Sequence, residues 1–533
     1  MDRKLDRDER DQLEQMLKGE EIGKQIRERQ EREEGHLIGG SFEDAERCSI
    51  SHKSIQMLRL TFCFLFFLLC LTPSLGLLIS GQEESSENRE RSVFPSLFLE
   101  DGSLNLRYLP EAGEYFQEHF GFRNELVTAN AVLSAEIGHV SSAEGVILGT
   151  DGWLFYKDSL GDFQGAGQLD LRALFDLAHT MALAQDYAES MGASFALAIA
   201  PNKNSLYGAY MPYYDRVTVS TEKNLTGIRS YLQEEGVHDA DLYEALSREA
   251  DARKESGGDP IYLKRDSHWN NEGAMLASRE ILKALGREMR DYTESRKIYR
   301  EDNRGDLDEM LYPARVKMER ELYFDPEADF SYVTDVPSNF YPLIDTESKG
   351  EGSLLMYRDS FGNKLLPYLA ENFGKAKFKR GWPYDLTPLS FGTSALLIEC
   401  AERFLPELAE NPPVFPAPLI LFLPGEAAEE KMYLEGMEVC YGRVLDSSCL
   451  ADLRSEAVLS EGASLVKVSG LLDRLELSER SRIFVSLDQT IWFEACPCHT
   501  REGMEGFSAC LDAALVTVEP EEAASVLTLA IGS

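Results

Sequence analysis

The chain has 533 residues, of which 43% are hydrophobic and 27% are charged. This composition excludes a wholly disordered chain and a bundle of membrane helices, and at about 150 residues per domain the length suggests three or four units. The 92 acidic residues outnumber the 54 basic residues and give a formal charge of −38, a field that repels phosphate backbones. We therefore expect no nucleic-acid partner.

Residues 60–80 form an apolar run without a charged side chain. As a helix the run would be about 31 Å long at about 1.5 Å per residue, which matches the hydrocarbon core of a bilayer. Basic residues precede it and the acidic segment QEESSENRE follows it, so the positive-inside rule places the N-terminus in the cytoplasm. The sequence predicts a single-pass anchor in the cell membrane, followed by a linker over 81–109 and an extracellular working part.

The charged leader, residues 1–59, is too long for the n-region of a cleaved signal peptide. Its few aliphatic residues are too sparse to build a core. We expect a cytoplasmic tail that is a solvated helix or is disordered.

Short aliphatic runs alternate with helical segments over residues 110–412, and the alternation is clear from about residue 140. A helix over 171–192 leads into the strand SFALAIA, and the strand SLLMY leads into a helix from residue 361. Such alternation is typical of a layered α/β sheet, and we expect a flavodoxin-like, three-layer domain. Residues 296–350 lose the rhythm and are expected to be an insertion.

The alternation stops after the proline-rich segment NPPVFPAPLILFLPG. Residues 418–533 contain several strand-like runs without a long helix, which predicts a separate β-sandwich, either glycan-binding or a packing module. Cysteines cluster in this region, and outside the cell disulfides can form, for example between Cys440 and Cys449 or between Cys510 and one of Cys496 or Cys498. The motif CPCH lacks a second ligand pair at zinc spacing, so no metal site is predicted.

Asp266 and His268 are separated by one residue in the segment RDSHWN. In an extended backbone both side chains point to the same face, so the carboxylate can hold one imidazole nitrogen. That pair is the base half of a hydrolase-type triad, although such pairs are also common in structural roles.

Ser360 lies in MYRDSFGN, where a predicted strand ends and a helix begins. A hydroxyl at this turn is exposed beyond the sheet edge, and the helix N-terminus offers N–H groups to a developing oxyanion. Ser360 or Asp359 could equally be a simple helix cap. Arg358 replaces the first glycine of the nucleophile elbow, which disfavours an α/β-hydrolase.

Five segments in order, GTDGWLFY, APNKNSLYGAYMP, DSHWN, YRDSFGN and LIECAERF, resemble the AlgX/AlgJ-type SGNH-hydrolase-like family with its DHHW relatives. Members of this family are extracytoplasmic polysaccharide O-acetyltransferases. The resemblance implies a permuted SGNH-like domain with Asp266, His268 and Ser360 as its triad. It also implies an acetyl-enzyme on Ser360, a cell-surface or exported polysaccharide as acceptor, and a membrane-bound acyl-transfer partner of the MBOAT type. No cofactor is expected.

Basic residues near the predicted site include Lys203, Arg358, Lys364, Lys377, Lys379 and Arg380. We expect Lys203, Arg358 and above all Arg380 to position substrate, and Trp382 with Tyr384 to stack on a sugar. The acidic chain argues against a polyanionic acceptor unless such a groove forms.

Two other functions remain open from the sequence. An esterase would use the same three residues but transfer the acetyl group to water. A non-catalytic glycan-binding scaffold would retain the fold without the chemistry.

Overall fold

The computed structural model describes residues 52–79, 93–99, 102–119, 121–333, 341–389, 392–425, 432–434, 436–460, 463–473, 475, 477–500 and 503–532. The prediction for the charged leader concerns residues that lie almost entirely outside this part of the chain. The chain divides into two compact units, one ending at Arg123 and the other running from Asn124 to the C-terminus.

The first unit contains α3 (His52–Ile79) and α4 (Tyr108–His119). Within α3 the segment Ile55–Thr72 has a mean hydropathy of 2.0, and by length and composition it can cross a membrane. It is the one helix of this kind in the described residues. The apolar helix expected from the sequence is thus confirmed, and it begins eight residues earlier than the uncharged run.

The second unit is built on a six-stranded sheet. In spatial order its strands are β3 (Ser194–Ala200), β10 (Ala395–Ala401), β8 (Ser353–Tyr357), β9 (Lys375–Lys379), β7 (Leu343–Ser348) and β6 (Phe330–Tyr332). The first four are parallel, whereas β7 and β6 extend the sheet as antiparallel edge strands. The carboxyl ends of the four parallel strands therefore meet at one edge, where open α/β sheets bind their ligands.

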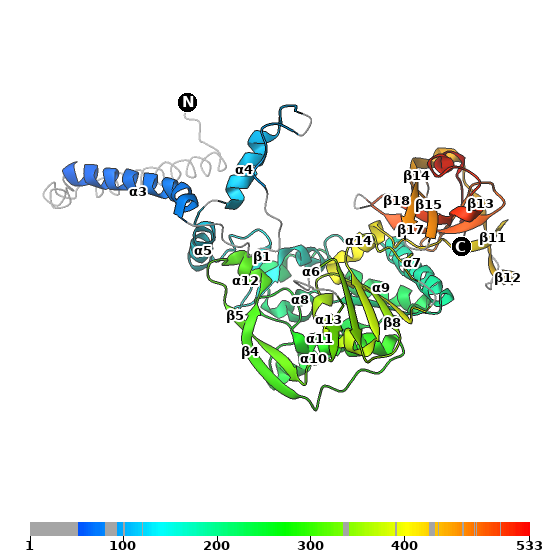
Figure 1. Ribbon diagram of the computed structural model, residues 1–533, viewed down its shortest axis with the longest axis horizontal. Helices are drawn as coiled ribbons and strands as arrows, with labels where there is room; N and C mark the ends of the chain where they lie inside the picture. Colours follow the sequence, from blue (N-terminus) through cyan, green and yellow to red (C-terminus); the bar gives the residue numbers. More distant parts are fainter. Residues whose placement is uncertain are drawn as a thin grey trace, which may run out of the picture. The chain divides into compact units, whose positions relative to one another are not determined.

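Helices cover both faces of this sheet, with some labelled in Figure 1. On one face α7 (Leu171–Ser190) and α9 (Asn224–Glu234) share a buried cluster with Leu355 and Tyr357 of β8. The alternate residues of that strand, Leu354 and Met356, join the cluster of α10 (Leu242–Ser256), α11 (Asn271–Ala284) and α13 (Gly362–Asn372). The period of two along each strand thus gives three layers, which confirms the α/β class.

The segment predicted as an insertion belongs in part to the sheet. It forms an antiparallel ribbon of β4 (Arg296–Arg304) and β5 (Met318–Asp325), with α12 (Asp306–Leu311) between them. It then supplies the edge strands β6 and β7. The alternation of apolar strands and helices is missing here because this ribbon is largely exposed to solvent. The edge strands also follow each other without a crossover helix.

The C-terminal region is rich in strands, as predicted. The nine strands among its described residues are β11 (Leu419–Pro424), β12 (Met432–Leu434), β13 (Met437–Val444), β14 (Leu450–Ser460), β15 (Ala463–Leu472), β16 (Arg482–Ser486), β17 (Trp492–His499), β18 (Glu505–Asp512) and β19 (Thr528–Gly532). Eight of them form one hydrogen-bonded path, and β12 pairs with β13 beside it. In this path β17 pairs with β16 through its first half and with β18 through its second half. Side chains from both sides of this junction pack in a common core, among them Val468, Val485 and Phe507.

The C-terminal sheet packs against α7 through buried ion pairs. His179 of α7 lies 2.8 Å from Glu494 of β17 and 2.8 Å from Glu235. Glu494 also pairs with Arg482 at 2.5 Å. Arg172, two turns further towards the start of α7, donates to the Ser481 carbonyl at 2.6 Å.

Cys449, Cys496, Cys498 and Cys510 are free thiols in the structure. The disulfides suggested by sequence proximity are therefore absent. Cys496 and Cys498 lie on β17, where their partners in the ladder are Ser508 and Gly506 of β18 rather than cysteines.

Candidate active site

Ser360 lies in a turn that joins β8 to α13 at the carboxyl edge of the sheet. The carboxylate of Asp359 accepts the backbone N–H groups of Phe361 and Ala401, both at 2.7 Å. The Asp359 side chain therefore joins two residues of the turn and also connects the turn to the end of the neighbouring β10. Asp359 thus holds the turn in place, while Ser360 remains partly exposed at its surface.

Gly362 is required where α13 leaves this turn. A Cβ atom at Gly362 would lie 2.6 Å from Cβ of Arg358 and 2.9 Å from a carboxylate oxygen of Glu399. Both neighbours are buried, so they have little room to retreat. The close approach lets α13 begin at Gly362, two residues after Ser360, so that the positive end of the helix dipole lies close to the turn.

The segment with Asp266 and His268 meets this turn from the loop before α11. His268 Nε2 lies 2.8 Å from Ser360 Oγ, and His268 Nδ1 lies 2.7 Å from Asp266 Oδ1. The same carboxylate oxygen accepts the His268 backbone N–H at 2.9 Å, so the pair forms in a bend rather than in the extended strand expected. The structure thus brings the three predicted residues into one hydrogen-bonded series.

Trp269 and Phe361 hold the two halves of this series together. The Trp269 indole donates to the Phe361 carbonyl at 3.2 Å, and the two rings pack edge to face at 4.9 Å. Both side chains are fully buried. Residues adjacent to His268 and Ser360 therefore fix the distance between them.

A second carboxylate, Asp306, lies beside the same imidazole. Its Oδ2 is 3.5 Å from His268 Nδ1, and it accepts hydrogen bonds from the hydroxyl and the backbone N–H of Ser267. Asp306 comes from the start of α12, in the segment that the sequence analysis treated as an insertion. No local motif marks it, so sequence reasoning missed it.

These charges set the titration of the imidazole. Burial alone would lower the pKa of His268, but the hydrogen bond and the charge of Asp266, with the charge of Asp306, raise that pKa above its ordinary value. Burial would raise the pKa of Asp266, yet its hydrogen bond with His268 and the charges of His268 and Lys364 hold that pKa well below the usual range. Asp266 is therefore ionised at neutral pH.

Ser360 and His268 open into a cleft of about 900 Å³. Its other walls include Tyr156, Asp158, Arg403 and Phe404, together with His499 at the end of β17 and Thr500 and Gly503 beyond it. His499 is fixed by Asp176 of α7 at 2.5 Å. The C-terminal region thus contributes one side of the cleft, which the sequence did not reveal.

Arg403 lines the cleft of Ser360, although it was not predicted to be a site residue. It follows β10, donates to Asn202 at 3.2 Å and lies 5.4 Å from the ring centres of Phe361 and Tyr156. The segment LIECAERF contained it, but only as part of the family resemblance. Its position suits the stabilisation of negative charge near Ser360.

Two of the predicted substrate ligands are buried away from the cleft, which corrects their assignment. Lys203 donates to the backbone carbonyls of Leu263, Lys264 and Asp266, the last at 2.5 Å, and burial lowers its pKa to about 8. Lys203 therefore stabilises the backbone of the Asp266 loop. Arg358 is 1% exposed and donates to Asn363 and to the Tyr341 carbonyl.

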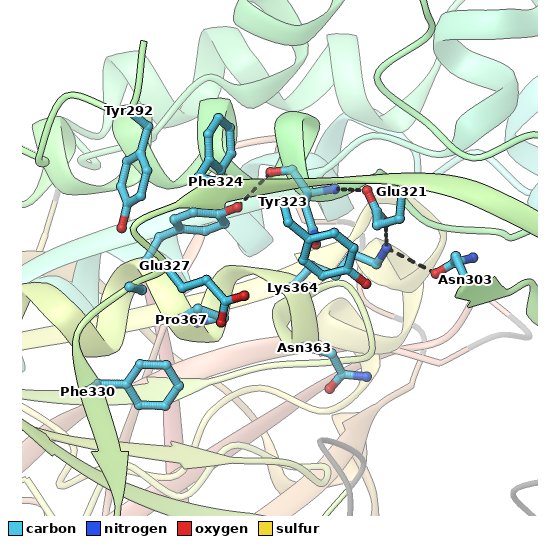
Figure 2. Close-up of a pocket in the computed structure, with 13 residues that line it drawn as sticks. Tyr292, Asn303, Glu321, Tyr323, Phe324, Glu327, Phe330, Asn363, Lys364 and Pro367 are labelled. Atoms are coloured by element: carbon cyan, nitrogen blue, oxygen red, sulfur yellow. Dashed lines mark hydrogen bonds and ion pairs between the residues drawn. The ribbon is translucent and has the colours of Figure 1, made fainter. Parts of the chain in front are cut away.

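Lys364 lies in a separate cavity of about 390 Å³ beside α13. Figure 2 shows its ammonium group between Glu321 and Asn303, with which it forms an ion pair and a hydrogen bond. Tyr323 and Phe330 also line this cavity. Lys364 therefore contributes its charge to Asp266 but does not line the cleft of Ser360.

Arg380, Trp382 and Tyr384 follow β9 but are not among the residues that line the cleft. Tyr384 is 1% exposed and stacks on Trp382 at 4.3 Å, and Trp382 also contacts Phe404 at 6.2 Å. The sugar-stacking platform expected from these rings is thus an internal aromatic contact. Phe404, by contrast, does line the cleft.

Asp266, His268 and Asp306 form the one group of potential metal ligands found among the described residues. Their donor atoms lie within 4.8 Å of one another. Both imidazole nitrogens already have hydrogen-bond partners, Asp266 on one side and Ser360 on the other. The arrangement therefore suits proton transfer between a hydroxyl and an imidazole.

A parallel α/β sheet with hydroxyl, imidazole and carboxylate joined at its carboxyl edge defines a hydrolase-type site. Residues 146–335 match the family model described as the SGNH hydrolase-like domain of acetyltransferase AlgX. This match confirms the predicted resemblance to the AlgX/AlgJ-type family. No curated protein matches the chain.

Several solved structures are similar to this chain. Bacillus cereus PatB1 with a sulfonyl adduct is 16% identical, over 49% of this chain and 96% of that chain, with a TM-score of 0.37. The O-acetyltransferase domain of Pseudomonas putida AlgJ is 19% identical, over 49% and 92%, with a TM-score of 0.30. Pseudomonas aeruginosa AlgX is 10% identical, over 73% and 93%, with a TM-score of 0.32.

Proposed function

We propose that the protein is a membrane-anchored O-acetyltransferase that modifies a cell-surface or exported polysaccharide outside the cytoplasm. The observation that carries the proposal is the hydrogen-bonded series Ser360–His268–Asp266 at the wall of an open cleft. The family-model match to an acetyltransferase domain supports the reaction class. The helix α3 supports a single-pass anchor with residues 81–533 outside.

In the first half-reaction Ser360 Oγ attacks the acetyl carbonyl of a donor ester, and its proton passes to His268 Nε2. The tetrahedral intermediate collapses to acetyl-Ser360, and the leaving group takes the proton from His268. Asp266 holds the imidazole tautomer and stabilises the imidazolium. The first turn of α13 and Arg403 stabilise the oxyanion.

In the second half-reaction a hydroxyl of the acceptor sugar attacks acetyl-Ser360 and gives its proton to His268. Collapse of the intermediate moves the acetyl group to the sugar, and the proton returns from His268 to Ser360 Oγ. No cofactor enters either step. A membrane-bound acyl-transfer partner of the MBOAT type would deliver the donor across the membrane.

The finer assignments of the fold belong to the same proposal. We assign a permuted, flavodoxin-like SGNH domain that ends at residue 412 and begins at Asn124, where the second compact unit starts, rather than at residue 110 as expected. We assign residues 418–533 to a β-sandwich. The contribution of His499 to the cleft supports a role for that second domain in holding the acceptor.

A transfer assay with isotopically labelled acetyl ester and an oligosaccharide tests the proposal. The wild type should produce both labelled oligosaccharide and labelled acetate, and Ser360→Ala should produce neither. Ser230→Ala is the control, because this exposed hydroxyl of α9 does not line the cleft, and its removal should leave transfer unchanged. If the amount of labelled acetate is the same with and without oligosaccharide, and no labelled oligosaccharide forms, the protein is an esterase instead.

A further inference from the structure

The cavity beside α13 is separate from the cleft of Ser360, and its lining combines aromatic rings with hydrogen-bonding groups. Its volume of about 390 Å³ lies within the range of pockets that hold small ligands. We propose that it is a subsite for one sugar ring of the acceptor, other than the ring that receives the acetyl group. This inference rests on the proposed acetyl transfer and adds a second binding position for its acceptor.

Aromatic rings make up much of the cavity lining. Phe324 and Tyr368 are 4% and 6% exposed, and their rings pack edge to face at 6.3 Å. Tyr323 and Phe330 are more exposed, and Figure 2 shows both at the cavity. The guanidinium of Arg300 lies 4.4 Å from the centre of the Tyr323 ring and helps to hold that ring in place. The apolar C–H face of a pyranose can therefore bury area against rings that are already fixed.

Three polar side chains at the cavity have hydrogen-bonding capacity to spare. Asn363 accepts from Arg358 through Oδ1, and its Nδ2 donor has no partner among the described residues. Asn303 accepts from Lys364 through Oδ1, whereas its Nδ2 is buried without an acceptor. The Glu327 carboxylate is 68% exposed and can accept a hydroxyl. Buried amide donors nearly always have an acceptor, so the donor of Asn303 indicates an oxygen of a ligand, and sugar hydroxyls suit this set of donors and acceptors.

The charged side chains that line the cavity all have partners of opposite charge. Lys364 forms an ion pair with Glu321, which is 2% exposed. Glu327 lies 3.6 Å from the guanidinium of Arg300 on β4. A phosphate or carboxylate ligand would have to compete with Glu321 for the ammonium group, and breaking a buried pair is costly. The hydroxyls of a sugar require no such exchange, so the lining favours a sugar ring over an anion.

The cavity begins within one helical turn of the nucleophile. Ser360 lines the cleft and Asn363 lines the cavity, and the Asn363 backbone N–H donates to the Ser360 carbonyl at 3.2 Å. Likewise Asn303 lines the cavity, and Asp306, three residues later, lines the cleft. The segments that carry Ser360 and Asp306 thus separate the two spaces. An oligosaccharide that places a hydroxyl at Ser360 can place a neighbouring ring in the cavity.

Binding of oligosaccharides to full-length Ser360→Ala in detergent tests the subsite without turnover. The probes are the disaccharide and the hexasaccharide of glucose, of mannose and of N-acetylglucosamine, and isothermal titration calorimetry gives each Kd. At least one hexasaccharide should bind about tenfold or more tightly than its disaccharide, because only the longer chain occupies both the cleft and the cavity. Tyr323→Ala in the same background should raise the Kd of that hexasaccharide by about fivefold or more, because a stacking ring is lost.

A second variant and a matched control locate the effect. Ala328→Trp fills the cavity instead of removing one of its rings, and it should also weaken binding of the hexasaccharide. Tyr299→Ala removes the same type of side chain from β4 of the same ribbon. Tyr299 is 44% exposed and does not line the cavity, so each Kd should stay unchanged.

The subsite would be overturned if every hexasaccharide bound no more tightly than its disaccharide. It would also be overturned if Tyr323→Ala and Ala328→Trp left the Kd unchanged, or if Tyr299→Ala raised it equally. The proposed function has a separate readout, namely the release of acetate from an activated ester by the wild type but not by Ser360→Ala. Absence of that release would overturn the acetyl transfer, while the binding experiment would still decide whether the cavity holds a sugar ring.

Discussion

Asp306 lies beside the imidazole of His268 although it comes from a segment without a recognisable motif. Its charge raises the pKa of His268, and the free imidazole must be neutral to accept the Ser360 proton. Asp306→Asn should therefore lower that pKa and move the acid limb of the kcat/KM profile to lower pH. Hydrolysis of a small neutral ester, measured across pH, checks the shift.

Asp158→Asn is the control for this prediction, because Asp158 lines the same cleft but is not among the groups whose charges contribute most to the pKa of His268. Its profile should follow that of the wild type. An unchanged limb in Asp306→Asn would show that Asp306 does not act on His268.

Gly362 offers a second test at the scale of a single residue. Gly362→Ala places a methyl group 2.6 Å from Cβ of Arg358, so either α13 or the Ser360 turn must move. We expect a loss of about 1–3 kcal/mol in the free energy of unfolding, typical of overpacking, and a larger relative loss of activity. Urea unfolding and ester hydrolysis measure the two effects. Gly381→Ala is a useful contrast, because a Cβ there meets no atom within 4 Å although its φ of 121° adds strain.

At the scale of secondary-structure elements, buried ion pairs hold α7 and β17 together. Glu494 is 2% exposed, and His179 donates from both ring nitrogens to carboxylates, which requires the imidazolium form. Burial would lower the pKa of His179, but the charge of Glu494 and the hydrogen bonds to both carboxylates raise it to about 9. The pair thus fastens the C-terminal sheet that supplies His499 to the cleft.

His179→Ala should lower the free energy of unfolding by about 3 kcal/mol, as expected for one partner lost from a buried pair. The folded pKa of His179 is raised, so its contribution is complete below about pH 6.5 and is lost as pH rises through about 9. Urea unfolding should therefore show the gap between variant and wild type closing above pH 9. His238→Ala, with a side chain 54% exposed, should change stability by less than about 0.5 kcal/mol. A gap that is the same at pH 6 and pH 10 would contradict the charged pair.

The apolar runs of the sequence were sufficient to predict elements that are largely buried. The helix at 171–192, the strand SFALAIA and the strand-to-helix step at Ser360 all occur where they were predicted. α10 was missed, because only Leu242, Leu246 and Ala250 are buried in a largely charged helix. The edge strands β6 and β7 were missed because they lack the alternation of a crossover unit.

The candidate site, like the fold, was predicted from the sequence only in part. Residues that act through adjacent backbone, such as Asp266 with His268, leave a local pattern, and the structure joins them to Ser360. Charge alone did not predict where Lys203 and Arg358 point, because their role depends on burial against distant carbonyls. Asp306, Arg403 and His499 reach the cleft only through tertiary packing.

At the scale of the whole molecule, the charge of −38 and the apolar helix α3 fit a protein whose anchor and acidic working part face different environments. The proposed orientation puts Cys48 in the cytoplasm and Cys449 outside. Cys449 is a partly exposed free thiol, whereas burial raises the pKa of Cys498 to about 12 and makes it a slow nucleophile.

A membrane-impermeant maleimide applied to cells with an intact cytoplasmic membrane should therefore label the wild type and Cys48→Ser alike. Cys449→Ser should remove most of the label. Labelling that depends on Cys48 instead would reverse the orientation and place the site in the cytoplasm.

The central claim is that Ser360 carries the acetyl group between donor and acceptor. Rapid mixing of the protein with an activated acetyl ester, acid quenching before turnover and peptide mapping by mass spectrometry test it directly. We predict one acetyl group on the peptide containing Ser360, its disappearance on addition of acceptor, and its absence in Ser360→Ala. An acetyl group that forms elsewhere at the same rate, or that persists in Ser360→Ala, would contradict the account.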